Sequence, residues 1–388
     1  MNQTPRGERL HIGIFGMRNA GKSSLLNALS GQEAALVSPV KGTTTDPVYK
    51  AMELLPIGPV MFIDTPGIDD EGALGNLRVE KARGILRKTD LALLVVDACE
   101  GLSKDDKALV RAFGEAGVKY IVVYNKSDLA KHESPDGIAV SAATGENITA
   151  LKEKIAKLAA QEDASEPLVA DLLRPGDVIV LVVPIDASAP KGRLILPQQQ
   201  AIRDALEAGA ISVVTQPRSL ADAFAKLKDP PRLVVTDSQV FAQVARLTPD
   251  SIALTSFSIL MARHKGVLEG AVEGARAIDA IRDGDNILIA EGCTHHRQCE
   301  DIGTVKLPGW IERHTGAKPE YTFSSGGGFP ADLSALQLIV HCGGCMQTPR
   351  EMRFRYRAAR EAGVPMTNYG IAISHMQGIL ARCIAPFL

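Results

Sequence analysis

Residues 16–23 read Gly-Met-Arg-Asn-Ala-Gly-Lys-Ser, which has the spacing G-x-x-x-x-G-K-S. The segment follows the apolar run Ile12–Phe15 and leads into a helical pattern over Ser23–Leu29. A glycine-rich loop between a strand and a helix is the setting in which this spacing surrounds the phosphates of a nucleotide. The sequence therefore predicts an α/β domain of the P-loop type around these residues.

The residues of this loop have separate expected roles. Gly16 and Gly21 let backbone N–H groups turn toward phosphate oxygens, and the next helix presents the positive end of its dipole. Lys22 is expected to reach the β- and γ-phosphates, and the Ser23 hydroxyl is expected to ligate Mg²⁺. The remaining predicted nucleotide contacts in the loop are Asn19, Ala20 and Ser24.

Later segments indicate which base is bound. Asn125-Lys126-Ser-Asp128 ends a strand-like apolar run. The Asp128 carboxylate can accept two N–H groups of guanine, whereas adenine offers no such pair of donors. The segment Ser141-Ala142 ends another short run and could place a backbone N–H on guanine O6. The predicted base is therefore guanine.

Two further segments concern the γ-phosphate and Mg²⁺. In Asp64-Thr-Pro-Gly67, Asp64 suits an outer-sphere contact to Mg²⁺ and Gly67 suits an N–H bond to the γ-phosphate. Residues 42–46 read Gly-Thr-Thr-Thr-Asp, and Thr44 is expected to join the Mg²⁺ shell when triphosphate is bound. The residues expected to act in catalysis are Lys22, Asn19, Thr44 and Asp64.

These motifs resemble the translation-factor-related class of GTPases, close to its TrmE- and Era-like members in tRNA modification and ribosome assembly. The resemblance covers about residues 8–160. Asn19 resembles the asparagine of potassium-dependent members, so a bound K⁺ could neutralise charge that develops on the phosphate. The alternative is a loop residue that caps its own turn. Ile68 occupies the place of a water-orienting glutamine, which implies slow hydrolysis.

Residues 168–264 are expected to form a second α/β domain, joined to the first domain (residues 1–161) by a polar linker. Strand-like and helical segments alternate here, which predicts a parallel sheet with right-handed crossovers. Residues 168–262 show no phosphate loop, paired carboxylates or metal-ligand spacing, so we interpret this region as a packing or dimer-forming module. Its predicted strands cover residues 178–183, 211–215, 232–236 and 252–254.

A third, smaller α/β domain is expected over residues 267–388, beginning with a helix at Leu268–Asp283. Two predicted strands, Asn286–Ala290 and Leu336–Val340, each lead directly into a segment rich in cysteine and histidine. Ligands of parallel sheets gather beyond the carboxyl ends of the strands, so the two segments are predicted to meet in one crevice. The residues brought together there are Cys293, His295, His296, His341, Cys342 and Cys345.

Thiolates from three cysteines select iron–sulfur clusters or zinc over hard cations. The paired glycines at 343 and 344 allow the tight turn that brings Cys342 and Cys345 to one metal. The first segment has no Cys-x-x-Cys pair, so the fourth ligand is left to a histidine, Cys299 or an exchangeable group. This favours a [4Fe–4S] cluster with one weakly held iron. The alternatives are a structural zinc site, a redox dithiol and buried inert thiols.

A potassium-type GTPase domain, a middle α/β domain and a C-terminal Cys-x-His…His-Cys-x-x-Cys domain together resemble the HydF family of [FeFe]-hydrogenase maturation GTPases, over essentially the whole chain. The resemblance implies a scaffold for a diiron precursor with carbonyl and cyanide ligands. Two radical-SAM maturases build this precursor, and the scaffold delivers it to the apo-hydrogenase. The middle domain of the family is a dimerisation module. The implied cluster ligands are Cys293, Cys342 and Cys345, with His295 and His341 beside the site and His296 as a candidate fourth ligand.

Composition agrees with a globular protein, with 45% apolar and 23% charged residues in 388. The formal net charge of −2 gives no global reason to expect binding to nucleic acid or membrane. No apolar stretch is long enough to span a bilayer, and residues 11–15 show no signal-peptide pattern, so a cytoplasmic location is expected. In a reducing compartment the six cysteines suit ligands better than disulfides.

The main competing interpretation is a GTPase of tRNA modification or ribosome assembly with a structural metal site. It requires an RNA-binding domain or a basic face. The nearest basic cluster lies at residues 350–360, where arginines recur along a helical pattern. We interpret this cluster as a solvated helix face.

Overall fold

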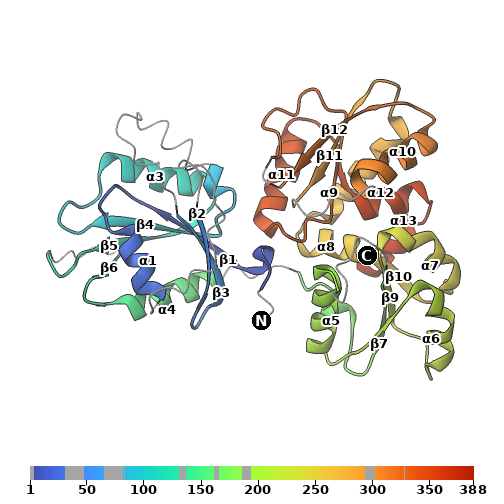
Figure 1. Cartoon of the computed structure of the whole chain (residues 1–388), viewed down its shortest axis with the longest axis horizontal. Helices are drawn as coiled ribbons and strands as arrows, with labels where there is room; N and C mark the ends of the chain where they lie inside the picture. The colour runs from blue at the N-terminus through green and yellow to red at the C-terminus, as the bar shows by residue number, and fades with distance from the viewer. Residues whose placement is uncertain are drawn as a thin grey trace. The chain divides into compact units, whose positions relative to one another are not determined.

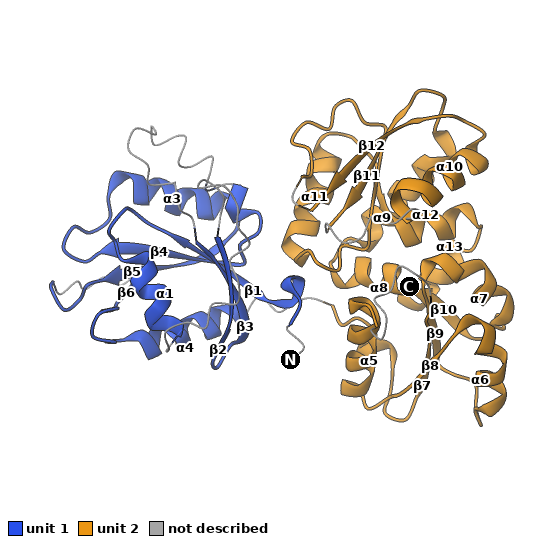
Figure 2. Cartoon of the chain, in the orientation of Figure 1, with its two compact units in different colours: residues 1–164 blue, residues 165–388 orange. Residues whose placement is uncertain are grey.

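The computed structural model describes most of the chain, which divides into two compact units at residues 1–164 and 165–388 (Figure 2). Unit 1 holds one sheet and unit 2 holds two. The predicted α/β class, with a P-loop domain followed by two smaller parallel-sheet domains, is confirmed. The exact domain boundaries stay predictions. The described residues are 4–30, 48–64, 82, 84–130, 137–160, 166–185, 194–292, 302–326 and 328–388.

The sheet of unit 1 has the strand order β2-β3-β1-β4-β5-β6 (Figure 1). Its neighbouring strands are parallel, except that β2 and β3 are antiparallel. Edge strand β2 escaped prediction because it is mostly half-buried and lacks a continuous apolar run. The strands are β1 (Leu10–Phe15), β2 (Val48–Leu54), β3 (Gly58–Asp64), β4 (Leu91–Asp97), β5 (Lys119–Asn125) and β6 (Gly137–Ala139).

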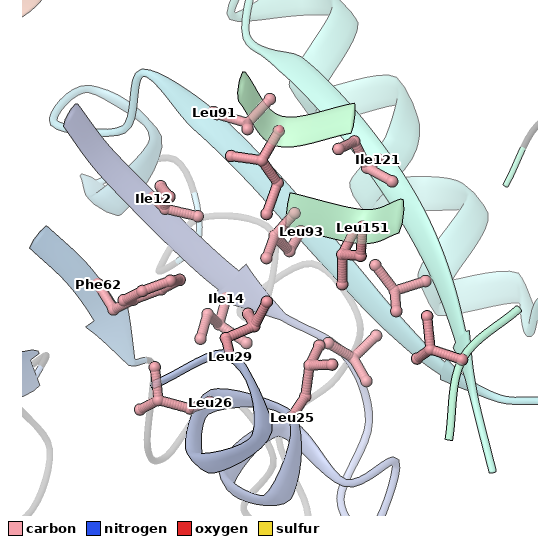
Figure 3. Close-up of a cluster of buried hydrophobic side chains, with 14 of the residues drawn as sticks. Ile12, Ile14, Leu25, Leu26, Leu29, Phe62, Leu91, Leu93, Ile121 and Leu151 are labelled. Atoms are coloured by element: carbon pink, nitrogen blue, oxygen red, sulfur yellow. The ribbon is translucent and has the colours of Figure 1, made fainter. Parts of the chain in front are cut away.

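Both faces of this sheet are buried, as expected for parallel strands covered by helices. On one face, Ile12 and Ile14 of β1 belong to the same buried cluster as three leucines of α1, Leu25, Leu26 and Leu29 (Figure 3). This packing holds the start of α1, and with it the glycine-rich loop, against the carboxyl end of β1. Helices α1 (Lys22–Ser30) and α4 (Ile148–Ala160) close this core, and α3 (Lys104–Glu115) closes the core on the opposite face.

The first sheet of unit 2 has the order β10-β9-β7-β8 and is parallel throughout. Its predicted strands are confirmed, with the same boundaries for residues 211–215 and boundaries that differ by no more than two residues elsewhere, and helices lie between them. The strands are β7 (Val178–Val182), β8 (Ile211–Thr215), β9 (Leu233–Thr236) and β10 (Ala253–Ser256). The helices are α5 (Leu196–Glu207), α6 (Leu220–Lys226), α7 (Phe241–Leu247) and α8 (Phe257–His264).

The second sheet of unit 2 has the order β12-β11-β13-β14 and is also parallel. Strands β11 and β13, which carry the predicted cysteine segments, are neighbours in this sheet. The strands are β11 (Asn286–Glu291), β12 (Glu320–Ser325), β13 (Leu338–His341) and β14 (Met366–Asn368). The helices are α9 (Leu268–Ala275), α10 (Leu307–Thr315), α11 (Pro349–Glu361) and α12 (Tyr369–Met376).

The helix predicted over Leu268–Asp283 is shorter than expected. Helix α9 ends at Ala275 and continues as the 3₁₀ segment η5 (Arg276–Ala280). A turn then stops it, because the Asp285 carboxylate accepts the backbone N–H of Arg282 at 2.8 Å and Gly284 has a positive φ of 79°.

The two sheets of unit 2 share a hydrophobic core. Met352 of α11 and Ile371 of α12 pack with Val180 and Val234 of the first sheet. The last helix, α13 (Leu380–Ile384), packs against β10, and its Cys383 is fully buried in the same core. Helices that come after the second sheet in sequence therefore complete the hydrophobic core of the first sheet. This explains why both sheets form one compact unit.

Candidate nucleotide and metal sites

The glycine-rich loop leaves β1 with the backbone conformation that the motif requires. Gly16 has a φ of 138°, and a side chain there would collide with the carbonyl oxygen of Val95 in the neighbouring strand β4. Asn19 has a φ of 64° and is exposed. The ammonium of Lys22 lies inside the loop and donates to the carbonyl oxygens of Gly16 (2.8 Å) and Met17 (3.0 Å). The cation is therefore held where phosphate oxygens are expected.

Asn125 joins two backbone segments of the site. Its amide donates to the Ala20 carbonyl oxygen at 2.9 Å, and its side-chain oxygen accepts the Ala142 N–H at 3.0 Å. The side chain is buried, and it fills the space that a Cβ at Gly21 would need. Asn125 thus holds the phosphate loop against the segment expected to recognise the base.

Asp97 is a residue of this site that the sequence motifs missed. It ends β4 directly beside Asn125 of β5, and its carboxylate accepts a hydrogen bond from the Lys126 ammonium at 2.6 Å. Burial raises the pKa of Asp97, but the bonds from Lys126 and the Cys99 N–H outweigh it and hold that pKa below its ordinary value. An acidic residue at the end of an apolar strand next to the base-recognition strand was the signal available in the sequence.

The other predicted nucleotide residues divide between described and undescribed parts of the chain. Asp64 ends β3, which is adjacent to β1 at the loop. Ser23, Ser24 and Asp128 are exposed, and Ser141 is buried. Thr44, Gly67 and Ile68 lie outside the described residues. The carboxyl ends of β1, β3, β4 and β5 thus gather at one edge of the sheet, where ligands of parallel sheets bind.

In unit 2 the carboxyl ends of β11 and β13 lie side by side. The Cys342 N–H donates to the Ala290 carbonyl oxygen at 2.8 Å, which continues the pairing of the two strands. The Cys342 Sγ then accepts the backbone N–H of Gly292 at 3.0 Å and that of Gly344 at 3.4 Å. The residue that follows Gly292 is Cys293, which lies outside the described residues together with His295, His296 and Cys299.

The turn that carries Cys342 and Cys345 lies between the two sheets of unit 2. Cys342 packs against the core of the second sheet, and Cys345 packs against a core of the first sheet. Gly344 has a φ of 64°, and a Cβ there would approach the Met352 Sδ to 2.6 Å. The side-chain amide of Gln347 donates to the carbonyl oxygen of Gly292 and so ties this turn to the end of β11.

His341 is fully buried next to these cysteines. The Arg355 guanidinium can only donate, so the His341 Nε2, 2.9 Å from it, must accept. His341 Nδ1 therefore carries the proton and donates to the Cys342 carbonyl oxygen at 2.7 Å. Burial, and then the charge of Arg355, lower the pKa of His341 to about 3, so the ring is neutral. Both ring nitrogens are engaged, and the residue orients the cysteine turn.

Arg355 corrects the interpretation of residues 350–360 as a solvated face. The Arg355 side chain is buried and bonds His341, the Glu351 carboxylate and the Gly326 carbonyl oxygen (3.0 Å). Three other arginines of the segment, Arg353, Arg357 and Arg360, line a groove whose other wall carries Glu269 and Glu273. An arginine inside a basic run looks exposed in sequence, because its buried partners are distant along the chain.

The chemistry of this donor set suits a thiolate-ligated cluster. Two thiols share one turn, a third cysteine follows the adjacent strand, and backbone N–H groups point at the Cys342 sulfur, where they favour the thiolate over the thiol. The same soft donors also suit zinc. None of the described helices is long and apolar enough to cross a membrane.

Curated relatives match less than half of the chain. A tRNA modification GTPase MnmE of Neisseria meningitidis is 36% identical over 169 residues, which are 42% of this chain and 37% of that protein. MnmE of Xanthomonas oryzae is 39% identical over 157 residues, 39% of this chain and 34% of that protein. This chain thus spans little more than a third of the length of these relatives.

Solved structures of GTP-binding proteins are also similar. Era of Aquifex aeolicus, bound to GDP and AlF₄⁻, has a TM-score of 0.32 and 22% identity, covering 61% of this chain and 97% of that chain. The G domain of the T. maritima FeoB iron transporter has a TM-score of 0.31 and 25% identity, and the match covers 39% of this chain and 99% of that chain.

Family models identify all three regions. Residues 11–126 match the 50S ribosome-binding GTPase model, so the chain is a GTPase-domain protein that carries further α/β domains. Residues 168–266 match the hydrogen maturase F dimerization domain, and residues 269–386 match its tetramerization domain. These two models together cover more than half of the chain. The chain belongs to the hydrogen maturase F family, HydF, as its motifs led us to expect.

Proposed function

We propose that this protein is a GTP-hydrolysing carrier in hydrogenase maturation. It binds a [4Fe–4S] cluster and a diiron precursor and delivers the precursor to apo-[FeFe]-hydrogenase. The observation that supports this best is the meeting of the β11 and β13 ends, where Cys342 accepts the Gly292 N–H in a chain of the HydF family. The partners are the apo-hydrogenase and the two radical-SAM maturases.

In this proposal Cys342, Cys345 and Cys293 hold the cluster. The fourth position is left to an exchangeable ligand such as His296. When bound, the cluster would supply an iron site with an exchangeable ligand, on which the diiron precursor could be carried. The chain orients the thiolates through the N–H groups of Gly292 and Gly344. Neutral His341 supports the turn without adding charge.

The nucleotide site is proposed to act as a slow, potassium-stimulated switch. Lys22 and the loop N–H groups bind the phosphates, Ser23 and Thr44 ligate Mg²⁺, Asp64 contacts the ion from the outer sphere, and Asn19 holds K⁺. Loops that order with triphosphate can change an interaction surface, so GTP is proposed to alter partner association. Equal partner dissociation rates with GTP, GDP and no nucleotide would contradict this part of the proposal.

A second candidate function is a GTPase of tRNA modification, favoured by the 36–39% identity to MnmE over 157–169 residues. Two observations count against it. The match covers at most 42% of the chain, whereas residues 168–266 and 269–386 match hydrogen maturase F domains. The basic segment at 350–360 has a buried arginine and lies along a groove lined by both charge signs. RNA recognition requires a continuous basic surface, and the mixed charges around residues 350–360 do not form one.

The deciding experiment loads anaerobically prepared protein with iron and sulfide, adds the product of the maturases and apo-hydrogenase, and measures hydrogen evolution. Cys342→Ser is expected to abolish activation and to leave GTP hydrolysis unchanged, because the two sites lie in different units. Cys99→Ser, which changes an exposed cysteine of unit 1, is the matched control and is expected to keep both activities. Wild-type protein that takes up no iron or acid-labile sulfide would refute the carrier function.

A further inference from the structure

A second group of potential metal ligands lies in unit 2, apart from the cysteines. Asp279 of η5, His314 of α10 and His375 of α12 each contribute one ligand atom, and these atoms all lie within 4.8 Å of one another. The Nε2 of His314 is 2.8 Å from the Asp279 Oδ1. The Nε2 of His375 is 3.0 Å from both carboxylate oxygens.

Three packed elements hold these side chains together. Helix α10 packs against both η5 and α12, and Figure 1 shows α10 and α12 side by side. The two histidine rings meet edge to face with their centroids 6.0 Å apart. His314 and His375 are 35 and 96 positions away from Asp279 in sequence, so the tertiary structure brings the three residues together.

The topology places this group away from the cysteine site. His314 and His375 are each the penultimate residue of their helix, and η5 comes just before β11. In a parallel α/β sheet the helices run back against the strands, so helix ends lie at the amino edge of the sheet. Cys342 directly follows β13 and lies at the carboxyl edge. The two groups therefore occupy opposite edges of the same sheet.

We propose that Asp279, His314 and His375 form a binding site for a divalent transition ion of the zinc class. Two imidazole nitrogens and one carboxylate oxygen are the ligand set of open zinc sites, whose fourth position holds water. The Asp279 side chain is 56% exposed and that of His314 is 29% exposed, which leaves one side open to solvent for such a ligand.

The distances from the two histidines to the carboxylate need little adjustment for an ion to bind. Ligand atoms around tetrahedral zinc, each about 2.0–2.1 Å from the metal, are about 3.3 Å apart. The observed separations of 2.8 and 3.0 Å to the shared carboxylate must open by a few tenths of an ångström. Each histidine also moves its proton from Nε2 to Nδ1, and the ion takes the place of two N–H···O bonds. This site is independent of the carrier function proposed above.

Cobalt titration of the full-length reduced protein, without an iron–sulfur cluster, tests the proposal, because Co²⁺ bound to thiolate absorbs by charge transfer and Co²⁺ bound to nitrogen and oxygen does not. Wild-type protein is expected to bind one Co²⁺ that shows ligand-field bands and no charge-transfer band. Any Co²⁺ bound to thiolate is counted separately from this ion. The variants Asp279→Asn and His314→Gln are expected to lose this Co²⁺, or to bind it more than about 10-fold more weakly. Zn²⁺ is expected to displace it.

Arg313→Ala changes the exposed neighbour of His314 and is expected to bind cobalt as the wild type does. Circular dichroism checks that each variant is folded. If Asp279→Asn does not fold, His375→Gln provides another variant that lacks one ligand. Unchanged stoichiometry and spectra in these ligand variants would overturn the proposal. So would a wild-type protein whose cobalt is all thiolate-bound, since the group would then be a hydrogen-bonded ion pair alone.

Discussion

Asn125 is the residue through which the phosphate loop and the base-recognition segment are joined. Motif reasoning assigns it to nucleotide binding, whereas the structure shows its side chain bonded to the backbone at Ala20 and Ala142. Its influence on the nucleotide therefore includes holding two loops at a fixed separation. Arg355 has a comparable place in unit 2, since it links His341 to Glu351 and Gly326.

Asn125→Ala is expected to weaken GDP binding by about 10-fold or more, because it leaves two backbone groups unsatisfied at about 1–3 kcal/mol each. Isothermal titration with GDP measures the effect. Asn27→Ala, an exposed change on α1, is the control and is expected to bind normally. Equal affinities of both variants and the wild type would mean that the loops hold their separation without Asn125.

The ion pair of Asp97 and Lys126 is expected to give a small, pH-dependent stability. The pKa of Asp97 is lowered in the folded protein, so its contribution is complete above the unfolded value of about 3.9 and disappears as pH falls through the folded value. Asp97→Asn is expected to lower the thermal midpoint at pH 7, by the equivalent of about 1 kcal/mol at most. The difference from wild type should vanish at acid pH, and a difference that grows there would contradict the assignment.

At the scale of elements, the two glycine turns place the functional side chains. The turn after β1 needs Gly16 because the backbone of β4 passes too close for a side chain. The turn after β13 needs Gly344 because its φ is 64°, and a Cβ there would also press on the Met352 side chain. In both places a strand ends and the chain must reverse over its neighbour within a few residues. Positive φ angles make this possible at low cost for glycine alone.

Gly344→Ala is expected to lose cluster binding and to destabilise unit 2. A left-handed alanine costs roughly 1–2 kcal/mol, and the contact with Met352 adds to it. Gly363→Ala is the matched control, because Gly363 also has a positive φ of 71° but a Cβ there meets nothing within 4 Å. Iron content after reconstitution and the thermal midpoint are the measurements. If both variants hold equal iron, the contact with Met352 has no part in the site.

At the scale of the whole molecule, unit 2 presents an edge for association. Strand β8 is at one end of its sheet, and two of its apolar residues are exposed, Ile211 by 54% and Val214 by 46%. An exposed, apolar edge strand is a template for pairing with another chain. This region matches a dimerization domain, and the strand is our candidate for the contact.

Val214→Lys is expected to shift the protein toward monomer, because a charge on this strand opposes both burial and pairing. Light scattering across a concentration series measures the mass. Leu206→Lys, on α5 and 57% exposed, is the control and is expected to keep the oligomer. An unchanged mass for Val214→Lys would assign dimer formation to another surface.

Local pattern was sufficient for most of the strands and for the GTPase class, and it predicted where the two sites lie. Apolar runs ended by Asp64, Asn125 and Cys342 predicted strands and their carboxyl ends, because side-chain burial and turn chemistry act over a few residues. Edge strands β2 and β12 escaped prediction, since half-exposed strands carry a weak apolar signal. Edge strand β14 is buried but has only three residues, Met366–Asn368, of which one is apolar, so it gives no apolar run.

Long-range contacts were decided by the tertiary structure. The sequence by itself determined the P-loop spacing and the GTPase class, which the family model matches, and it predicted the set of cysteine ligands. Folding alone brought Arg355 to His341, Asp97 to Lys126, and Asp279 to two histidines 35 and 96 residues away. The physical reason is that packing can bring together side chains from any part of the chain, and a buried charge such as that of Arg355 then requires a partner.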